Sequence, residues 1–128
     1  MDSILIIIVD DDESIRKSFS RLIALTEFKP VAFENTRECM VYLEGQSGRD
    51  MPLGYLVDMH IVGDQDGPEQ LHDFLKERDM LRNFYFMTGD LTFRNQQVLK
   101  RTGIDVLMKD NYELFDVINK MCSMSRKD

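Results

Sequence analysis

The chain has 128 residues, enough for one domain that buries a sizeable core without disulfide or metal staples. A composition of 43% hydrophobic and 30% charged residues, with 3 Pro and 7 Gly, excludes disordered, collagen-like and low-complexity proteins. The 16 Lys and Arg residues against 23 Asp and Glu residues give a net charge of −7. This charge argues against direct binding to nucleic acid or to an anionic membrane surface.

Cysteine usage and hydropathy predict a cytoplasmic protein. Cys39 and Cys122 lie far apart, form no Cys-x-x-Cys motif, and are expected to be reduced thiols. The longest apolar run, Ile4–Val9, is too short to cross a bilayer and lacks the flanks of a signal peptide. We therefore expect no contact with a membrane.

A block of mostly β-branched residues, Ile4–Val9, predicts a strand buried on both faces of a parallel sheet. A helix with one apolar stripe should follow, capped by Asp12 or Ser14 and ending near Thr26. A second strand is expected over Pro30–Phe33, where the proline favours an edge position or the first place in the strand.

The middle of the chain repeats this alternation. Asn35–Glu38 has the cap-plus-acid spacing of a helix start. A third strand is predicted over Leu53–Val57 and ends at Asp58. Gly67 and the proline after it open a third helix. A fourth strand covers Phe84–Met87.

The last third predicts a helix over Thr92–Thr102 closed by Gly103, a strand over Ile104–Met108, and a helix over Asn111–Cys122. Residues 1–122 then form one domain, and the polar tail Ser123–Asp128 should fray. Five strands alternating with five helices are typical of an α/β fold with an open, doubly wound sheet.

Polar side chains follow four of the predicted strands, where parallel sheets carry their functional groups. In chain order they are Asp10, Asp11, Asp12, Asp58, Thr88 and Lys109. Any one of them could be a helix cap or a solvated side chain, and we read Asp12 as a cap. Four strand ends together favour one site.

The chemistry of this set points to phosphoryl transfer. Crowded carboxylates resist ionising together unless a cation shares their site, and oxygen ligands favour Mg²⁺ over Zn²⁺. A hydroxyl and an ammonium can hold the oxygens of an anion. The residues alone thus suggest a Mg²⁺-dependent aspartyl-phosphate site.

Five motifs in order resemble the receiver domain of response regulators, the phosphoacceptor module of bacterial two-component signalling. The motifs are Ile7–Asp12, Leu56–Asp58, Asp66–Gly67, Met87–Gly89 and Met108–Lys109, and together they extend over essentially the whole chain. The resemblance implies a flavodoxin-like, five-stranded parallel sheet in the order 2-1-3-4-5 with five helices.

The resemblance also implies roles for the site. Asp58 would be the phosphoacceptor, taking its phosphoryl group from the phosphohistidine of a sensor histidine kinase or phosphotransfer protein. Asp11 and Asp58 would bind Mg²⁺ directly, as would the backbone carbonyl of His60, and Asp10 would bind through water. No enzymatic activity is expected beyond self-phosphorylation and autodephosphorylation.

The remaining implied roles concern the phosphate and the output. Thr88 and Lys109 would hold the phosphoryl oxygens, while His60 and Asp90 would tune the lifetime of the phosphate. A downstream protein partner or effector domain would read the face formed by the fourth helix, the fifth strand and the fifth helix. The switch position on that strand is Val106.

The chain departs from the receiver pattern at several places. Val62 stands where a proline is usual, and the loop before Asp66 is one residue longer. Asp110 replaces the usual cis proline after Lys109, so a trans peptide is expected. Val106 replaces an aromatic residue, so the aromatic rotamer readout is absent or replaced.

Other residues have simpler interpretations. His60 and His72 are expected to be solvated rather than metal ligands. The 9 Met residues are expected to fill gaps in the core. Phe93 and Tyr112 are expected to pack in the core or between helices, with partner contact as the alternative.

Three other functions remain open at this point. A receiver-like module could bind partners without phosphorylation. A phosphohydrolase of the haloacid-dehalogenase type would use Asp10 as nucleophile and Asp12 as general acid, but the chain leaves little room for a substrate cap. A flavin carrier is disfavoured because the acidic loop Asp10–Glu13 would repel a phosphate.

Overall fold

The apolar blocks form one parallel sheet in the order β2-β1-β3-β4-β5, as predicted. The computed structural model describes residues 4–45, 52–89, 91–109 and 111–126. Its strands are β1 (Ile4–Val9), β2 (Phe28–Phe33), β3 (Gly54–Asp58), β4 (Phe84–Thr88) and β5 (Asp105–Met108). Its helices are α1 (Glu13–Ala24), α2 (Thr36–Gly45), α3 (Gly67–Glu77), α4 (Phe93–Thr102) and α5 (Asn111–Arg126).

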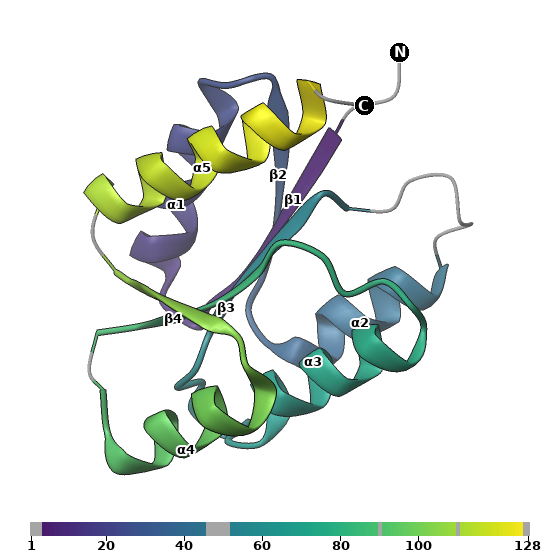
Figure 1. Cartoon of the computed structure of the whole chain (residues 1–128), viewed down its shortest axis with the longest axis vertical. Coiled ribbons are helices and arrows are strands. Elements are labelled where there is room, and N and C mark those ends of the chain that lie inside the picture. The colour runs from purple at the N-terminus through teal and green to yellow at the C-terminus, as the bar shows by residue number, and fades with distance from the viewer. Residues whose placement is uncertain (1–3, 46–51, 90, 110, 127–128) are drawn as a thin grey trace.

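Helices cover both faces of the sheet, α1 and α5 on one side and α2, α3 and α4 on the other (Figure 1). The central strand β1 supplies side chains to both resulting cores. Ile6 and Ile8 pack with α1 and α5, and Ile7 and Val9 pack towards α2 and α3. Alternate residues point to opposite faces of a strand, which is why this strand is apolar throughout.

The predicted cap at Asp12 and the predicted helix end at Gly103 are present, and Thr92 adds a cap that was not predicted. The Asp12 carboxylate accepts a hydrogen bond of 2.8 Å from the Ser14 N–H at the start of α1. The Thr92 hydroxyl accepts one of 3.1 Å from the Asn95 N–H at the start of α4. Gly103 ends α4 in the left-handed conformation, with φ of 70°, which favours glycine.

Asp58 and Thr88, where the third and fourth strands were predicted to end, are the last residues of β3 and β4, because the ladder continues through the pairs Asp58–Met87 and Thr88–Met108. Two other predicted boundaries were wrong by a few residues. β2 begins at Phe28, where its pairing with Ile4 starts. The helix predicted to end at Cys122 continues to Arg126, so residues 123–126 are helical.

Two interpretations of single side chains were also wrong. His72 is not solvated but 3% exposed, with its ring edge against Phe84 and Nδ1 2.9 Å from Asp73 Oδ1. Phe93 is 77% exposed rather than packed in the core. The side chain of Tyr112 lies outside the described residues, as does that of Cys122, whereas Cys39 is a free, buried thiol.

Among the described residues, no helix has the length and apolar character needed to span a bilayer.

Candidate functional site

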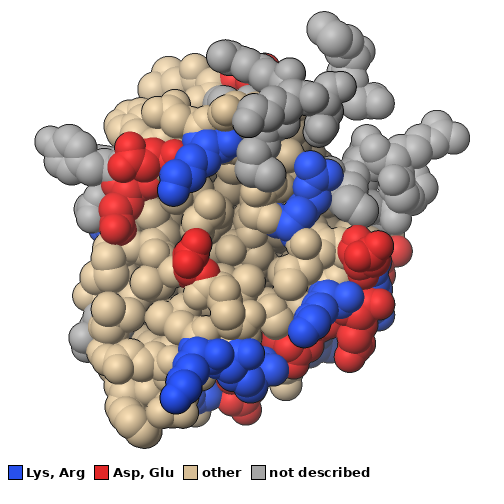
Figure 2. Space-filling view, in the orientation of Figure 1, with Lys and Arg blue, Asp and Glu red and all other residues tan. Residues whose placement is uncertain are grey.

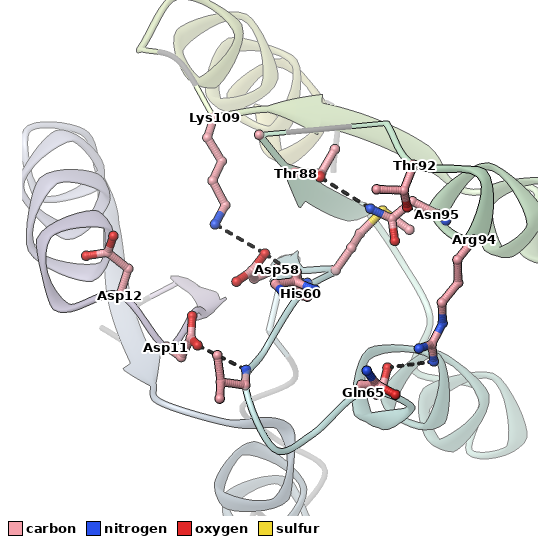
Figure 3. A pocket seen from close by; sticks show the side chains of 13 residues that line it. Asp11, Asp12, Asp58, His60, Gln65, Thr88, Thr92, Arg94, Asn95 and Lys109 are labelled. Carbon is pink, nitrogen blue, oxygen red and sulfur yellow. Dashed lines mark hydrogen bonds and ion pairs between the residues drawn. The ribbon is translucent and has the colours of Figure 1, made fainter.

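A cleft of about 580 Å³ opens at the carboxyl edge of the sheet (Figure 3). Its lining comes from segments far apart in the chain, namely the ends of β3, β4 and β5, the loops after β1 and β3, and the start of α4. Of the residues predicted for the site, Asp11, Asp58, His60, Thr88 and Lys109 line this cleft. The residues predicted at the strand ends therefore do lie around one cleft.

Three carboxylates form a cluster at the cleft, and two of them, Asp11 and Asp58, line it. Asp10, Asp11 and Asp58 each offer an oxygen, and these oxygens lie within 4.8 Å of one another. Asp10 is fully buried and Asp58 is 2% exposed. The Asp12 N–H donates to Asp10 Oδ1 at 2.9 Å and the His60 N–H to Asp58 Oδ1 at 3.1 Å, so the chain orients both buried side chains.

Lys109 supplies the positive charge that faces this cluster. Its Nζ lies 2.9 Å from Asp10 Oδ2 and 3.2 Å from Asp58 Oδ1, and its side chain is 20% exposed. The backbone N–H of Lys109 donates to the Thr88 carbonyl at 3.2 Å, which fixes the end of β5 beside β4. One ammonium thus bridges two buried carboxylates.

The positive charge of Lys109 does not neutralise the three clustered carboxylates. The excess negative charge affects the pKa of Asp58. Burial and the neighbouring charge of Asp10 raise the pKa of Asp58 to about 6, against the opposing effects of the His60 N–H and Lys109. Burial alone would lower the pKa of Lys109, but the hydrogen bonds and charges of Asp10 and Asp58 raise it. The site therefore has a surplus of negative charge near neutral pH.

The donor set fits a hard divalent cation. All three clustered side chains offer oxygen, and two of them are buried with less positive charge than they need. Asp11 reaches the cluster from the loop after β1, and its Oδ2 accepts a hydrogen bond of 3.1 Å from the Val62 N–H. Asp10, Asp11 and Asp58 could therefore hold Mg²⁺ between them.

Sequence reasoning missed two residues of the cleft that come from α4. Asn95 is 9% exposed, and its Nδ2 donates to the Thr88 hydroxyl at 3.5 Å. Arg94 precedes it and points across the cleft towards Gln65 (Figure 3). The signal that could have found them is the helix predicted to begin at Thr92, because a helix that follows a parallel strand begins at the carboxyl edge of the sheet.

The loop after β3 is anchored by Asp64. Its Oδ2 accepts a hydrogen bond of 2.6 Å from the Thr36 hydroxyl and one of 3.1 Å from the Thr36 N–H. Gly67 lies against this pair, and a Cβ there would come within 2.2 Å of Asp64 Oδ1 and 2.3 Å of Thr36 Oγ1. The longer loop predicted from the sequence is thus fastened to the start of α2.

A Gly67→Ala variant should lose about 2 kcal/mol of unfolding free energy, because the added methyl group must displace the Asp64–Thr36 pair. Urea denaturation at pH 7.5 measures the loss. Gly45→Ala is the control, since a Cβ at Gly45 meets no atom within 4 Å. Equal stability of both variants would show that the Asp64–Thr36 pair can be displaced without loss of unfolding free energy.

Two residues of the predicted site, Asp10 and Val106, do not line the cleft. Asp10 contributes an oxygen to the carboxylate cluster. Val106 is half-buried on β5 and packs against the core beneath α2 and α3. Asp90 and Asp110, with their predicted roles in phosphate lifetime and in the trans peptide, lie outside the described residues.

Solved structures with the same architecture are numerous. A response regulator receiver domain protein from Methanospirillum hungatei has a TM-score of 0.77 at 21% identity, covering 99% of this chain and 100% of that one. The chain has the fold of response-regulator receiver domains. A receiver protein from Pseudoalteromonas atlantica has a TM-score of 0.77 at 17% identity, over 94% of this chain and 98% of that one.

A third receiver fold of this kind belongs to chemotaxis protein CheY4 of Vibrio cholerae, with a TM-score of 0.75 at 16% identity over 94% of this chain and 99% of that one. No protein-family model matches the sequence, and neither does any curated protein. The likeness to solved structures confirms the predicted receiver fold. Function must be argued from the cleft, because one fold supports many activities.

Proposed function

We propose that this chain is a phosphoacceptor receiver that takes a phosphoryl group onto Asp58 and acts in the cytoplasm. The observation that carries the proposal is the position of the Asp58 carboxylate, which lines the cleft and lies 3.2 Å from the Lys109 ammonium. Two further carboxylates flank it. A sensor histidine kinase or a phosphotransfer protein is the donor.

In the transfer step, an Asp58 carboxylate oxygen forms a P–O bond to the phosphorus while the P–N bond to the donor imidazole breaks. The electron pair of that bond stays on the imidazole nitrogen. Lys109 neutralises charge on the phosphoryl oxygens, and the Thr88 hydroxyl donates to one of them. Positioning and charge neutralisation account for most of the catalysis in such transfers.

Mg²⁺ is the implied cofactor, and when bound it supplies positive charge to the phosphoryl oxygens. Asp11 and Asp58 would hold it directly, together with the His60 carbonyl, and Asp10 would hold it through water. The clustering of three carboxylate oxygens within 4.8 Å supports this assignment.

The output is proposed to pass through α4, β5 and α5 to a downstream protein or effector domain. Figure 2 shows few charged side chains in the middle of the face over β5, with Lys, Arg, Asp and Glu mainly around it. Phe115 of α5 is 47% exposed and Leu91, before α4, is 43% exposed. Such a surface suits a protein partner better than a nucleic acid.

The position of Asp10 outside the cleft lining disfavours the phosphohydrolase alternative. A nucleophile must meet its substrate, and although Asp10 and Asp58 are both buried, Asp58 lines the cleft whereas Asp10 does not. A module that binds partners without phosphorylation is the other alternative, and the experiment below separates all three.

The proposal is tested by intact-mass spectrometry and peptide mapping after incubation with Mg²⁺ and acetyl phosphate. We expect one phosphoryl group on Asp58 and none in Asp58→Asn, while Asp105→Asn, which removes an exposed carboxylate, should still be phosphorylated. Phosphate on Asp10, or donor hydrolysis that survives Asp58→Asn, would instead indicate the hydrolase. No adduct and no binding of beryllofluoride would indicate the phosphorylation-independent module.

Mg²⁺ should stabilise the folded protein, because only the folded chain brings the three carboxylates together. At ten times its dissociation constant, the gain should be about 1.4 kcal/mol of unfolding free energy. Thermal unfolding with and without MgCl₂ measures it, and Asp11→Asn should lose most of the gain. Equal stabilisation of both proteins would place the metal elsewhere.

A further inference from the structure

Arg94 connects two walls of the cleft. It stands in the first turn of α4, and its Nη2 lies 2.7 Å from Asp66 Oδ1 and 3.3 Å from the Gln65 carbonyl oxygen. Gln65 and Arg94 both line the cleft (Figure 3). The guanidinium is therefore held on the side of the β3–α3 loop, turned away from Asp58.

The ion pair between Arg94 and Asp66 can be broken at little cost. The Arg94 and Asp66 side chains are 49% and 75% exposed, and an ion pair between exposed side chains contributes little net stability. A guanidinium is planar and presents parallel N–H donors that match the oxygens of a phosphate. A doubly charged phosphoryl group in the same cleft would compete well against one exposed carboxylate.

A count of charges shows that the phosphorylated site needs one positive charge in addition to those of Lys109 and Mg²⁺. The three clustered carboxylates carry three negative charges, which Lys109 and a bound Mg²⁺ together balance. A phosphoryl group on Asp58 adds about one further negative charge at neutral pH. Among the described residues that line the cleft, Lys and Arg are represented by Lys109 and Arg94 alone.

We propose that Arg94 is a phosphoryl-binding residue that exchanges Asp66 for the phosphoryl group on Asp58. This inference rests on the proposed function. The exchange would draw the first turn of α4 towards the end of β3. It would give the chain a link between phosphorylation and α4 that needs no aromatic side chain at Val106.

The test uses beryllofluoride, a mimic of the aspartyl phosphate, titrated with Mg²⁺ into the full chain by calorimetry. Arg94→Gln should weaken its binding about tenfold, since a charge-assisted pair is lost, and Arg94→Lys about threefold, since charge is kept without the fork. Asp66→Asn should tighten binding two- to threefold by releasing Arg94. In the Arg94→Gln background the same change should have no effect.

Arg101→Gln is the matched control. Arg101 lies on the same helix with its side chain 51% exposed and pairs with Glu69 and Asp73 of α3, but it does not line the cleft. Its loss should change the affinity less than twofold. If Arg94→Gln binds as tightly as Arg101→Gln, or if Asp66→Asn acts equally in both backgrounds, the assignment of Arg94 is wrong. If the wild-type chain binds no beryllofluoride, the proposed function fails as well.

Discussion

Replacing Lys109 by Met should lower the free energy of unfolding by about 3 kcal/mol at pH 7.5, because two buried carboxylates then lose their shared counter-charge. The rate of phosphorylation of Asp58 by acetyl phosphate should fall about 100-fold, as expected when one preorganised charge is removed from a transfer site. Urea denaturation without Mg²⁺ measures the first effect. Time-resolved intact mass with Mg²⁺ measures the second.

Lys100→Met is the control, since Lys100 is an exposed lysine of α4. The deficit of Lys109→Met should shrink when MgCl₂ is added or when the pH is lowered towards 5, because a metal ion or a proton can replace the missing charge. A Lys109→Met protein as stable as the control would mean that the charge of Lys109 does not stabilise the cluster.

The fold and the floor of the site were predictable because they depend on short-range pattern. A strand buried on both faces must be apolar throughout, so its polar neighbours in sequence mark its end. Parallel strands then bring those ends to one edge of the sheet, irrespective of the conformation of the loops. Asp58, Thr88 and Lys109 follow directly from this rule, as does their proximity to Asp10 and Asp11.

The parts that could not be predicted depend on where loops and helix starts lie in space. The pairing of Arg94 with Asp66 joins residues 28 positions apart, and that of Thr36 with Asp64 does the same. Neither contact produces a periodic pattern in the sequence. Such contacts can be predicted only when the three-dimensional course of the connecting segments is known.

His72 is a different case, because the signal was present. Pro68, Leu71, His72 and Leu75 are all buried and follow the i, i+3, i+4, i+7 spacing of a helix face. Reading His72 as solvated gave more weight to its polarity than to its place in that stripe. Its Nδ1 contact with Asp73, at 2.9 Å, is how the buried ring keeps a polar partner.

Asp58→Asn should unfold with a higher free energy than the wild type at pH 7.5 without Mg²⁺. Burial and the charge of Asp10 raise the pKa of Asp58 from 3.8 to about 6, so the folded state holds its proton more tightly than the unfolded state. Each pKa unit corresponds to 1.36 kcal/mol, so the ionised carboxylate costs the wild type about 3 kcal/mol at neutral pH. Asparagine has no such charge and can still accept from the His60 N–H.

The sign of the pH dependence separates this explanation from a simple packing effect. The contribution of Asp58 to the wild-type free energy of unfolding should become more favourable as the pH falls from about 7 to about 4, because protonation removes the buried charge. The stability advantage of Asp58→Asn should therefore vanish near pH 4. Urea denaturation across this range measures it, with Asp105→Asn as a control that removes an exposed carboxylate. An advantage that persists unchanged at pH 4 would come from packing or hydrogen bonding. On the proposed function, the chain would hold its phosphoacceptor at the expense of stability. Mg²⁺ should narrow the gap between the two proteins by stabilising only the one that keeps the full carboxylate cluster.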